Sequence, residues 1–317
     1  MGRDRGNEHR YRNASDRPKI STRQIREPEM PTIPYHPDET SLFHPERSAT
    51  LFVAGGNPSD VQVGIECARL AYVRAEDGGA GLATLTAALA AAGFGGPRLF
   101  ADKDPDPLTN TGTQGYAAVR ADGRAVLAFR GTQPDSMQDL LTDAKAIPTD
   151  WPESGGRVHE GFAKGLRSVR AQVDDWVAGA AVDARRLLIC GHSLGAALAT
   201  LAASILQPAQ LVTLGSPRTG DANFARTLHG VGAVRLVDCC DIVTQLPPES
   251  PWYTHVGDLR YIDRNGDLSH APSELAMGLD QTEARLAYAL GPARTAGNAV
   301  SRGLADHAPI NYARAFF

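Results

Sequence analysis

The pentapeptide Gly191-His192-Ser193-Leu194-Gly195 carries the clearest chemical signal in the sequence. It fits G-x-S-x-G, a pattern that exposes a serine hydroxyl at the tip of a strand-to-helix turn. Glycine two residues before and two after the serine removes side chains that would obstruct so tight a turn. The following helix directs its positive N-terminus towards negative charge that develops at the serine. The pattern therefore predicts Ser193 as a nucleophile.

The residues on either side of this pentapeptide favour a nucleophilic turn over an ordinary β-to-α connection. Leu187–Cys190 is a short apolar run that predicts a strand, and Leu194–Leu206 is an alanine-rich segment that predicts a helix. Small residues let such a helix approach a sheet closely. By length, the whole run 187–206 could pass for a membrane span, but its internal glycines and polar residues favour a strand, a turn and a buried helix. We therefore expect no transmembrane segment.

A serine hydroxyl is a weak nucleophile until a histidine removes its proton and an acid orients that histidine. In a fold with this turn, the acid and then the histidine follow the serine along the chain. Asp238 and Asp241 both come after the strand predicted for Ala233–Val237, and the position of Asp241 further into the loop slightly favours it. Three histidines follow these carboxylates: His255, His270 and His307.

The surroundings of the three histidines differ. His255 belongs to Tyr253–Ile262, which predicts a strand and suits a structural role. His270 follows a turn-like segment and is expected at the surface. His307 lies near the C-terminus, where the last loop of such a fold would be. His192, inside the pentapeptide, is expected to point away from the serine and to serve packing.

Strands and helices alternate around these candidates, which predicts a mostly parallel sheet whose active site lies beyond the carboxyl ends of the strands. Asp122-Gly123 between two short β-prone runs predicts a hairpin. The remaining expected elements are helices over 60–72, 81–92, 161–181 and from 224, and strands over 116–119, 125–129 and 210–214.

Composition divides the chain into two parts. Residues 1–30 are polar and charged, and residues 31–58 are rich in proline. We expect residues 1–57 to be disordered or extended and residues 58–317 to form the catalytic domain. Met30 offers an alternative start site.

The overall composition is that of a globular protein, with 42% hydrophobic residues, 21% charged residues and a net charge of −4. This balance does not favour a nucleic-acid partner. The spacing of the four cysteines indicates neither a disulfide framework nor a zinc site. Since the N-terminus has no apolar signal core, we expect a cytoplasmic protein, with secretion without a leader as the alternative.

Taken in order, the motifs of this chain resemble those of the class 3 lipases, which include fungal triacylglycerol lipases and bacterial relatives. The resemblance covers roughly residues 58–317 and rests on the segments Phe129–Thr132, Asp139–Asp143, Val158–Phe162, Gly191–Ala196, Leu214–Arg218, Asp241–Val243, Leu246–Pro248, Tyr253–His255 and Asp306-His307.

This resemblance implies an α/β-hydrolase fold, with a mostly parallel central sheet flanked by helices. It implies Asp241 as the catalytic acid and His307 as the base. The backbone N–H groups of Thr132 and Leu194 would form the oxyanion hole, and Asp143 would orient the side chain of Thr132. Such a site needs no metal ion or organic cofactor.

The sequence departs from the family pattern in two places and in its expected lid. Leu140 stands where the family usually has tryptophan, and Thr244 stands where it has proline. The expected lid, Gln133–Leu141, has few large apolar residues, so we expect at most modest activation at a lipid surface. Ser273–Leu290 could form a wall of the acyl pocket or a helix packed on the core.

We therefore expect a serine hydrolase of carboxylic esters, acting on acylglycerols and touching lipid surfaces transiently. A phospholipase A1 or an aryl-ester esterase on the same scaffold is the alternative enzyme, because a fold does not fix a substrate. A catalytically silent binding module is the alternative from another class, and the joint presence of Ser193, Asp241 and His307 argues against it. No pattern in the sequence sets the oligomeric state.

Overall fold

The computed structural model describes residues 1–2, 33–104, 111–131 and 147–317. The chain divides into two units, Met1–Pro31 and Thr32–Phe317, and only Met1 and Gly2 of the first are described. The second unit contains the elements discussed below.

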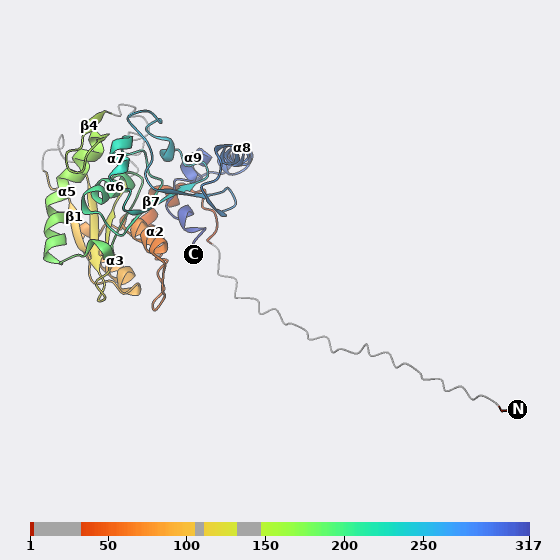
Figure 1. The fold of residues 1–317 in the computed structure, drawn as a ribbon, viewed down its shortest axis with the longest axis horizontal. Helices are drawn as coiled ribbons and strands as arrows, with labels where there is room; N and C mark the ends of the chain where they lie inside the picture. Colours follow the sequence, from red (N-terminus) through yellow and green to blue (C-terminus); the bar gives the residue numbers. More distant parts are fainter. Residues whose placement is uncertain (3–32, 105–110, 132–146) are drawn as a thin grey trace. The chain divides into compact units, whose positions relative to one another are not determined.

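Eight strands of the described residues form one sheet in the order β1-β2-β3-β6-β7-β8-β9-β10 (Figure 1). The strands from β3 to β9 pair in parallel, and β1, β2 and β10 add antiparallel edges. The mostly parallel sheet expected from the sequence is thus confirmed. The strands are β1 Arg98–Ala101, β2 Gln114–Val119, β3 Ala125–Phe129, β6 Leu187–His192, β7 Gln210–Leu214, β8 Gly232–Asp238, β9 Asp258–Ile262 and β10 Leu268–His270.

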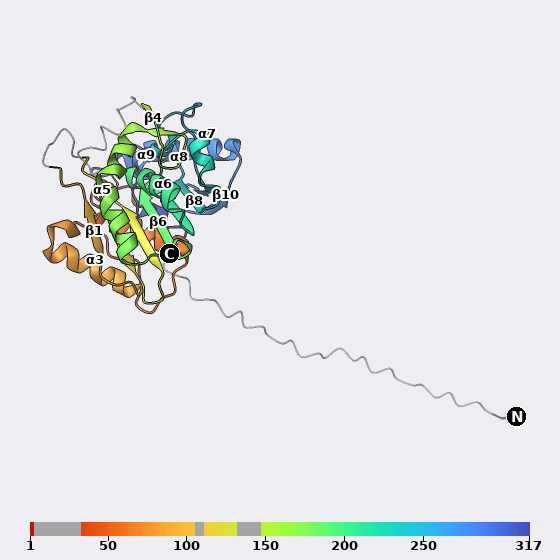
Figure 2. The ribbon, with the colours of Figure 1, turned by 60° about the vertical axis from the view of Figure 1, so that its left-hand side comes forward.

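Helices cover both faces of this sheet. Successive residues of its central strands point to opposite faces, and both sets are apolar. Val126 and Leu188 belong to one core cluster with α2 and α3, whereas Leu127 and Ile189 belong to another with α5 and α6. Figure 2 shows α5 and α6 in front of the central strands. The helices are α1 Glu39–Phe43, α2 Asp60–Leu70, α3 Gly79–Ala91, α5 Glu160–Gly179, α6 Leu194–Leu206, α7 Ala222–Arg226, α8 Glu274–Leu290 and α9 Arg302–Ala305.

Short elements complete the described fold. A separate hairpin pairs β4 Pro148–Asp150 with β5 Arg157–His159. Six 3-10 turns connect the larger elements within the described ranges: Pro45–Arg47, Ala75–Asp77, Ala184–Arg186, Val243–Gln245, Pro292–Arg294 and Asn311–Ala313.

Most predicted elements form where the sequence indicated them, and the start of β9 is an exception. The strand expected from Tyr253 begins only at Asp258. Gly257 adopts φ +88°, a left-handed conformation that interrupts the extended chain. His255 therefore lies in a loop.

The segment before α2 also differs from its expected extended form. It contains α1, capped by Asp38, and it buries Leu42 and Phe52 in the core. Its backbone is held by Asn311, whose Oδ1 accepts from the N–H of His36 and whose Nδ2 donates to the carbonyl of the same residue, both at 2.9 Å. These contacts join residues far apart in sequence, so the proline-rich composition of the segment could not predict them.

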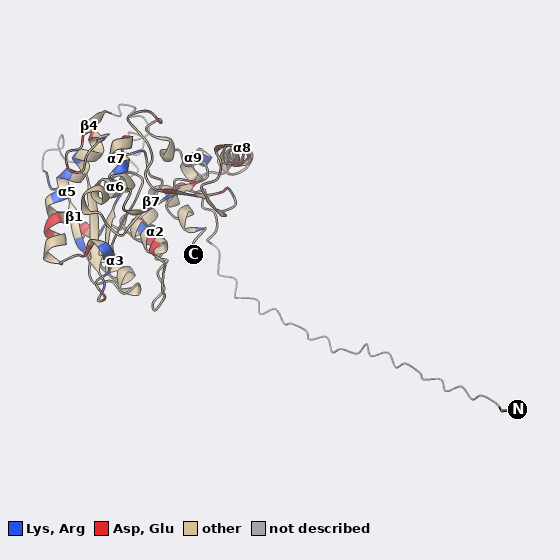
Figure 3. Ribbon diagram, viewed as in Figure 1, with Lys and Arg blue, Asp and Glu red and all other residues tan. Residues whose placement is uncertain are grey.

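Charged residues of both signs are interspersed over the described part of the chain, for example along α2 and α5 (Figure 3). None of the helices in the described ranges combines the length and the apolar character that a membrane span requires.

Candidate active site

The turn between β6 and α6 holds Ser193 in a conformation that side-chain-bearing residues rarely adopt. Its φ and ψ are 58° and −129°, and it occupies the N-cap position of α6. A Cβ atom at Gly191 would collide with the carbonyl of Gly195, and one at Gly195 would collide with the carbonyl of Phe129. The two glycines of the motif are therefore required by close backbone packing, and they allow the strained turn to form.

Ser193 is fully buried, and its backbone N–H donates to the carbonyl of Leu214 at 3.0 Å. Its Oγ has no hydrogen-bond partner among the described residues. Gly131 lies against it, since a Cβ there would stand 3.1 Å from the Cβ of Ser193 and 2.6 Å from the carbonyl oxygen of His192. The loop after β3 thus reaches the serine directly.

Asp241 and His307 form a buried pair although 66 residues separate them. Nδ1 of His307 lies 2.8 Å from Oδ2 of Asp241, and both side chains are inaccessible to solvent. Nε2 of His307 has no partner within the described residues. A carboxylate on one ring nitrogen orients the imidazole and leaves the other nitrogen able to accept a proton.

Two further donors hold the carboxylate of Asp241. Oδ1 accepts from the N–H of Val243 at 2.9 Å, and Oδ2 accepts from the hydroxyl of Tyr312. Burial, followed by the negative charge of Asp241, raises the pKa of Tyr312 well above its usual range, so this hydroxyl remains a donor. No motif signalled Tyr312, because its contact with Asp241 arises only from the tertiary fold.

Gly215 at the end of β7 makes room for the pair. It adopts φ +56°, and a Cβ there would lie 2.6 Å from Oδ2 of Asp241 and 3.1 Å from the ring of His307. A side chain at this position would displace the hydrogen-bonded atoms, so the backbone of Gly215 forms one wall of the site.

His192 is more than a packing residue. Its Nε2 lies 2.9 Å from the carbonyl oxygen of His307, so this nitrogen carries the proton, and its Nδ1 accepts from the hydroxyl of Tyr72 at 2.7 Å. Burial, and secondarily the neighbouring His307, hold the pKa of His192 well below its ordinary value. The neutral ring therefore links the serine turn to the backbone of His307, and its ring centroid lies 4.5 Å from that of His307.

The alternative acid, Asp238, has a different environment. It is fully buried, and neither carboxyl oxygen has a hydrogen-bond partner in the described part of the chain. Burial, with a further contribution from Asp306, raises the pKa of Asp238 well above its usual range. The carboxylate that accepts the hydrogen bond from Nδ1 of His307 belongs to Asp241.

Asp306, which precedes His307, fixes the position of this loop. Its carboxylate accepts from the hydroxyl of Tyr35 at 2.8 Å, from Nε of Arg302 at 2.7 Å and from the N–H of Cys240 at 2.9 Å. Since Cys240 directly precedes Asp241, Asp306 connects the loop of the acid to the loop of the histidine.

The other two histidines lie outside this arrangement. Nε2 of His255 donates to the carbonyl of Thr244 at 3.0 Å, and burial lowers the pKa of His255 to about 3, with Arg235 as the next cause. His270 is exposed and contacts Arg260. Thr244, at the position where the family has proline, donates its hydroxyl to the carbonyl of Asp241 at 2.8 Å.

The remaining predicted site residues divide between described and undescribed segments. Leu194 is the first residue of α6, directly after Ser193. Thr132, Asp143 and the expected lid Gln133–Leu141 lie outside the described residues.

One cluster in the described ranges has metal-ligating atom types within 4.8 Å of one another: Cys239, Cys240 and Asp306. The carboxylate of Asp306 is already engaged by three donors, and the thiol of Cys239 donates to Asp280 at 3.2 Å. The cluster is therefore a hydrogen-bond network that supports the loop before Asp241.

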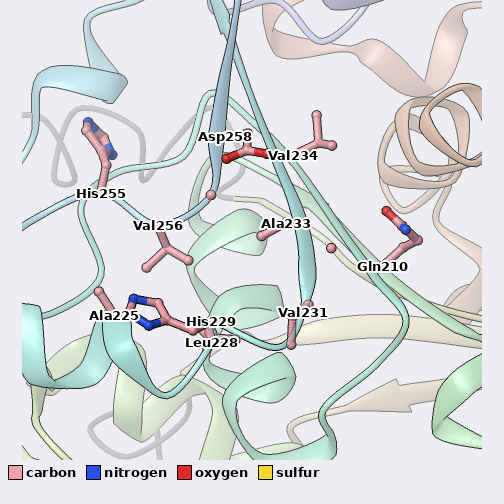
Figure 4. A pocket seen from close by; sticks show the side chains of 12 residues that line it. Gln210, Ala225, Leu228, His229, Val231, Ala233, Val234, His255, Val256 and Asp258 are labelled. Carbon is pink, nitrogen blue, oxygen red and sulfur yellow. The ribbon is translucent and has the colours of Figure 1, made fainter. Parts of the chain in front are cut away.

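A pocket of about 430 Å³ lies at the amino-terminal ends of β7, β8 and β9, where Gln210, Gly232 and Asp258 begin these strands (Figure 4). Ser193 and the Asp241–His307 pair follow the carboxyl ends of the parallel strands. Active sites of such sheets form at the carboxyl ends, so this pocket is separate from the candidate site.

Residues 126–250 match the family model described as lipase (class 3). This range includes Ser193 and Asp241 and ends before His307. The secreted mono- and diacylglycerol lipase A of Penicillium cyclopium is 32% identical over 187 residues, covering 53% of this chain and 57% of that protein. The chloroplastic phospholipase A(1) DAD1 of Arabidopsis thaliana is 31% identical over 194 residues, covering 50% of this chain and 43% of that protein. The chain thus spans about half the length of these relatives.

Among solved structures, the lipase from Rhizopus microsporus var. chinensis matches with a TM-score of 0.54 and 25% identity, covering 73% of this chain and 84% of that structure. This match and the parallel sheet confirm the α/β-hydrolase fold.

The relatives also correct one expectation. Several are named as secreted lipases, from Penicillium and Fusarium, which contradicts the cytoplasmic location expected from the N-terminal sequence. Residues 3–32, on which that expectation depended, lie outside the described part of the chain.

Proposed function

We propose that the protein is a serine hydrolase of carboxylic esters, with acylglycerols as its main substrates, and the premise is the match of residues 126–250 to the class 3 lipase family model. The observation that carries the proposal is the buried pair of His307 and Asp241. Nε2 of His307 is the ring nitrogen that does not bond to Asp241. This ring lies beside His192, which belongs to the serine turn.

The first half of the reaction forms an acyl-enzyme. Nε2 of His307 removes the proton of Ser193 Oγ as this oxygen attacks the ester carbonyl carbon. The tetrahedral intermediate collapses, the bond to the alcohol oxygen breaks, and the histidine returns its proton to the leaving alcohol. Asp241 stabilises the imidazolium that exists between these two transfers.

The second half repeats this chemistry with water. His307 takes a proton from a water molecule as the water oxygen attacks the acyl carbon. The bond to Ser193 then breaks, Oγ regains the proton, and the carboxylic acid leaves. The N–H groups of Leu194 and Thr132 are proposed to bind the oxyanion in both halves, where one lost donor typically costs about 2.7–4 kcal/mol.

Acylglycerols are the preferred substrate class because matched relatives are named as mono- and diacylglycerol lipases. A phospholipase A1 activity is the second candidate, supported by the match to Arabidopsis proteins of that name. The two substrates differ in the group at the third glycerol position, which does not take part in the proton transfers.

Labelling and hydrolysis test the nucleophile together. We expect a fluorophosphonate to modify Ser193 in the wild type, as read by peptide mass spectrometry, and Ser193→Ala to lose both labelling and hydrolysis of p-nitrophenyl butyrate. Ser204→Ala is the matched control, since Ser204 is a buried serine on α6 that bonds to Trp151 and Leu201 away from the turn. Near-normal turnover by a folded Ser193→Ala protein would refute the assignment.

The base and acid are tested by two further variants. His307→Ala should reduce kcat as strongly as Ser193→Ala, because members of such a triad act as a unit. Asp241→Asn should reduce it by roughly 10⁴. If His255→Ala is the severe change and His307→Ala is mild, the base is misassigned. Parallel assays with dioctanoylglycerol and with phosphatidylcholine decide between the two substrate classes.

A further inference from the structure

Helix α8 exposes four leucines on the side opposite its packed face. Its packed side contains Ala284 and Tyr288, which are buried, and Met277, which is half-buried. The leucines follow one another at intervals of four or seven residues, so they form a single stripe on the helix. Their exposed fractions are 74% for Leu275, 59% for Leu279, 62% for Leu286 and 62% for Leu290.

One role considered for Ser273–Leu290, a helix packed on the core, is confirmed for the packed side, where Tyr288 belongs to a core cluster. The leucine side fits neither role. Large apolar side chains that line an acyl pocket or pack on the core are covered, whereas these four are mostly accessible. Figure 1 shows α8 at the edge of the second unit, beside α9. We name Leu275, Leu279, Leu286 and Leu290 the leucine stripe.

The apolar surface extends beyond the leucine stripe. A pocket of about 380 Å³ lies beside α8 and is lined in part by Ala289, Ala293, Val300 and Ile242. Val300 and Ile242 are themselves exposed. Since Ile242 follows Asp241 in the chain, this surface reaches the loop that carries the proposed acid.

The packed side of α8 forms hydrogen bonds with the same loop, at Cys239 and Cys240. Nε2 of Gln281 donates to the carbonyl of Cys239 at 2.9 Å, and the thiol of Cys240 donates to the carbonyl of Gln281 at 3.5 Å. Asp280 accepts from Tyr261 at 2.8 Å and from Nη1 of Arg264 at 2.9 Å. The helix is therefore fixed to the scaffold of the candidate site, and its leucines are exposed without any opening movement.

Three occupants could cover such a face. A second copy of this chain is disfavoured by area, since the leucine stripe together with Val300 and Ile242 offers roughly 400 Å² and stable interfaces use about 800 Å² per partner. The undescribed residues 3–32 are also a poor match. Their large apolar side chains are few and do not recur at helical spacing: Tyr11, Ile20, Ile25 and Met30.

A lipid surface fits the remaining observations. An amphipathic helix held parallel to such a surface inserts its apolar side chains without requiring a complementary shape. The exposed charges on and beside α8 balance, with Glu274 and Glu283 against Arg285 and Arg294. This balance favours an uncharged or zwitterionic surface over an anionic one.

We propose that the leucine stripe of α8 docks the protein on a neutral lipid surface and holds the candidate active site beside it. The purpose of this docking rests on the proposed ester hydrolase function. It differs from a lid because α8 is rigidly anchored and leaves access to Ser193 unchanged.

Flotation with vesicles of diether phosphatidylcholine, which an ester hydrolase cannot cleave, measures docking separately from catalysis. We expect the wild type to float with these vesicles and Leu279→Ser/Leu286→Ser to lose about tenfold or more in partitioning. The control is Val53→Ser/Leu82→Ser, which removes two exposed apolar side chains elsewhere and should bind as the wild type does. Adding phosphatidylglycerol to the vesicles should change binding less than twofold.

Kinetics and hydrodynamics complete the test. The leucine variant should hydrolyse soluble p-nitrophenyl butyrate at the wild-type rate and emulsified triolein at about a tenth of it. Equal flotation of the leucine variant and the wild type, or no flotation of the wild type, would overturn the proposal. So would a wild-type dimer that the variant converts to a monomer, because the stripe would then bind a second copy. Leucine-dependent flotation without ester hydrolysis would refute the proposed function alone and leave the docking surface standing.

Discussion

At the scale of single residues, the candidate site depends on backbone positions that leave no room for a side chain. Gly215 faces the hydrogen bond between Asp241 and His307, and its φ of +56° is costly for any other residue. Gly131, Gly191 and Gly195 around the serine likewise have no space for a Cβ atom. The geometry of the candidate site therefore depends on positions without a side chain as well as on the side chains of Ser193, Asp241 and His307.

Gly215→Ala should reduce kcat by roughly a hundredfold with little change in KM, because the added Cβ displaces the acid and the imidazole and a misplacement of about 1 Å costs about that much. Gly123→Ala is the control, since Gly123 has a φ of +84° and meets only the side chain of Arg186 at an ordinary distance. Both variants carry the conformational cost of a positive φ, and the contact with Asp241 should lower the thermal unfolding temperature of Gly215→Ala further. Equal activities of the two variants would contradict the assignment of the pair.

Tyr312→Phe should lower kcat about tenfold and leave KM nearly unchanged. The substitution removes one donor to the carboxylate of Asp241, and a hydrogen bond to a charged group contributes about 1.5–3 kcal/mol. Tyr253→Phe is a matched control, because Tyr253 is buried but its hydroxyl has no partner in the described residues. Steady-state kinetics on a soluble ester distinguish the two variants, and a fully active Tyr312→Phe enzyme would show that Asp241 needs no second side-chain donor.

At the scale of elements, the segment before α2 forms hydrogen bonds with the loop that carries His307, although the sequence predicted a disordered or extended segment. Tyr35 bonds to Asp306, and the backbone of His36 bonds to Asn311. Leu42 and Phe52 enter the core that also contains α2.

Deleting residues 1–57 should therefore lower the free energy of unfolding by at least about 3 kcal/mol, since it removes buried large side chains. Deleting residues 1–31 retains these contacts and is the matched comparison. Urea unfolding followed by fluorescence measures both. Equal urea midpoints for the two deletions would show that residues 33–57 contribute nothing to the stability of the second unit.

The elements near the serine could be predicted because their signals are local. Apolar strands of four to six residues, the Asp122-Gly123 turn and the alanine-rich helix after Ser193 each depend on neighbours in sequence, and the structure reproduces α6 and β7 at the expected residues. Ser59 caps α2 and forms a full capping box with Gln62, a contact between residues only three positions apart.

What the sequence could not reveal depends on distant contacts. The bond from Tyr312 to Asp241 spans 71 residues, and the bond from Tyr35 to Asp306 spans 271. The exposure of the leucine stripe was equally hidden, because periodicity identifies an apolar face of a helix but does not say whether another element covers it. The roles of Ser193, Asp241 and His307 remain predictions until the variants are measured.

At the scale of the whole molecule, we expect the buried His192 and the half-buried His255 to make the fold sensitive to acid. Burial holds the pKa of His192 well below its ordinary value and that of His255 at about 3. Above a pH of about 6.5 these rings are neutral in both the folded and the unfolded chain. As the pH falls below that value, the unfolded chain binds protons that the folded chain excludes, so stability is lost.

Each such histidine should reduce the free energy of unfolding by up to about 1.4 kcal/mol per pH unit between the unfolded and the folded pKa. His255→Gln keeps a donor for the carbonyl of Thr244 and removes one titrating ring, so its stability should fall less steeply between about pH 6 and 4. His270→Gln changes an exposed histidine and serves as the control. Urea midpoints across this range decide the matter, and parallel slopes for all three proteins would exclude His255 as a source of acid sensitivity.

The glycines that surround the serine and its partners also determine how this protein can be altered by laboratory evolution. A Cβ added at Gly131, Gly191, Gly195 or Gly215 would meet backbone atoms or atoms of the proposed triad, so we expect substitutions there to remove activity before they can change selectivity. Variation is tolerated where a side chain already faces outward, as at Ile242 beside Asp241. Libraries that keep the four glycines fixed and randomise Ile242 and the residues of the leucine stripe should therefore yield active variants with new preferences for the physical state of the substrate, while the bond-breaking chemistry stays constant.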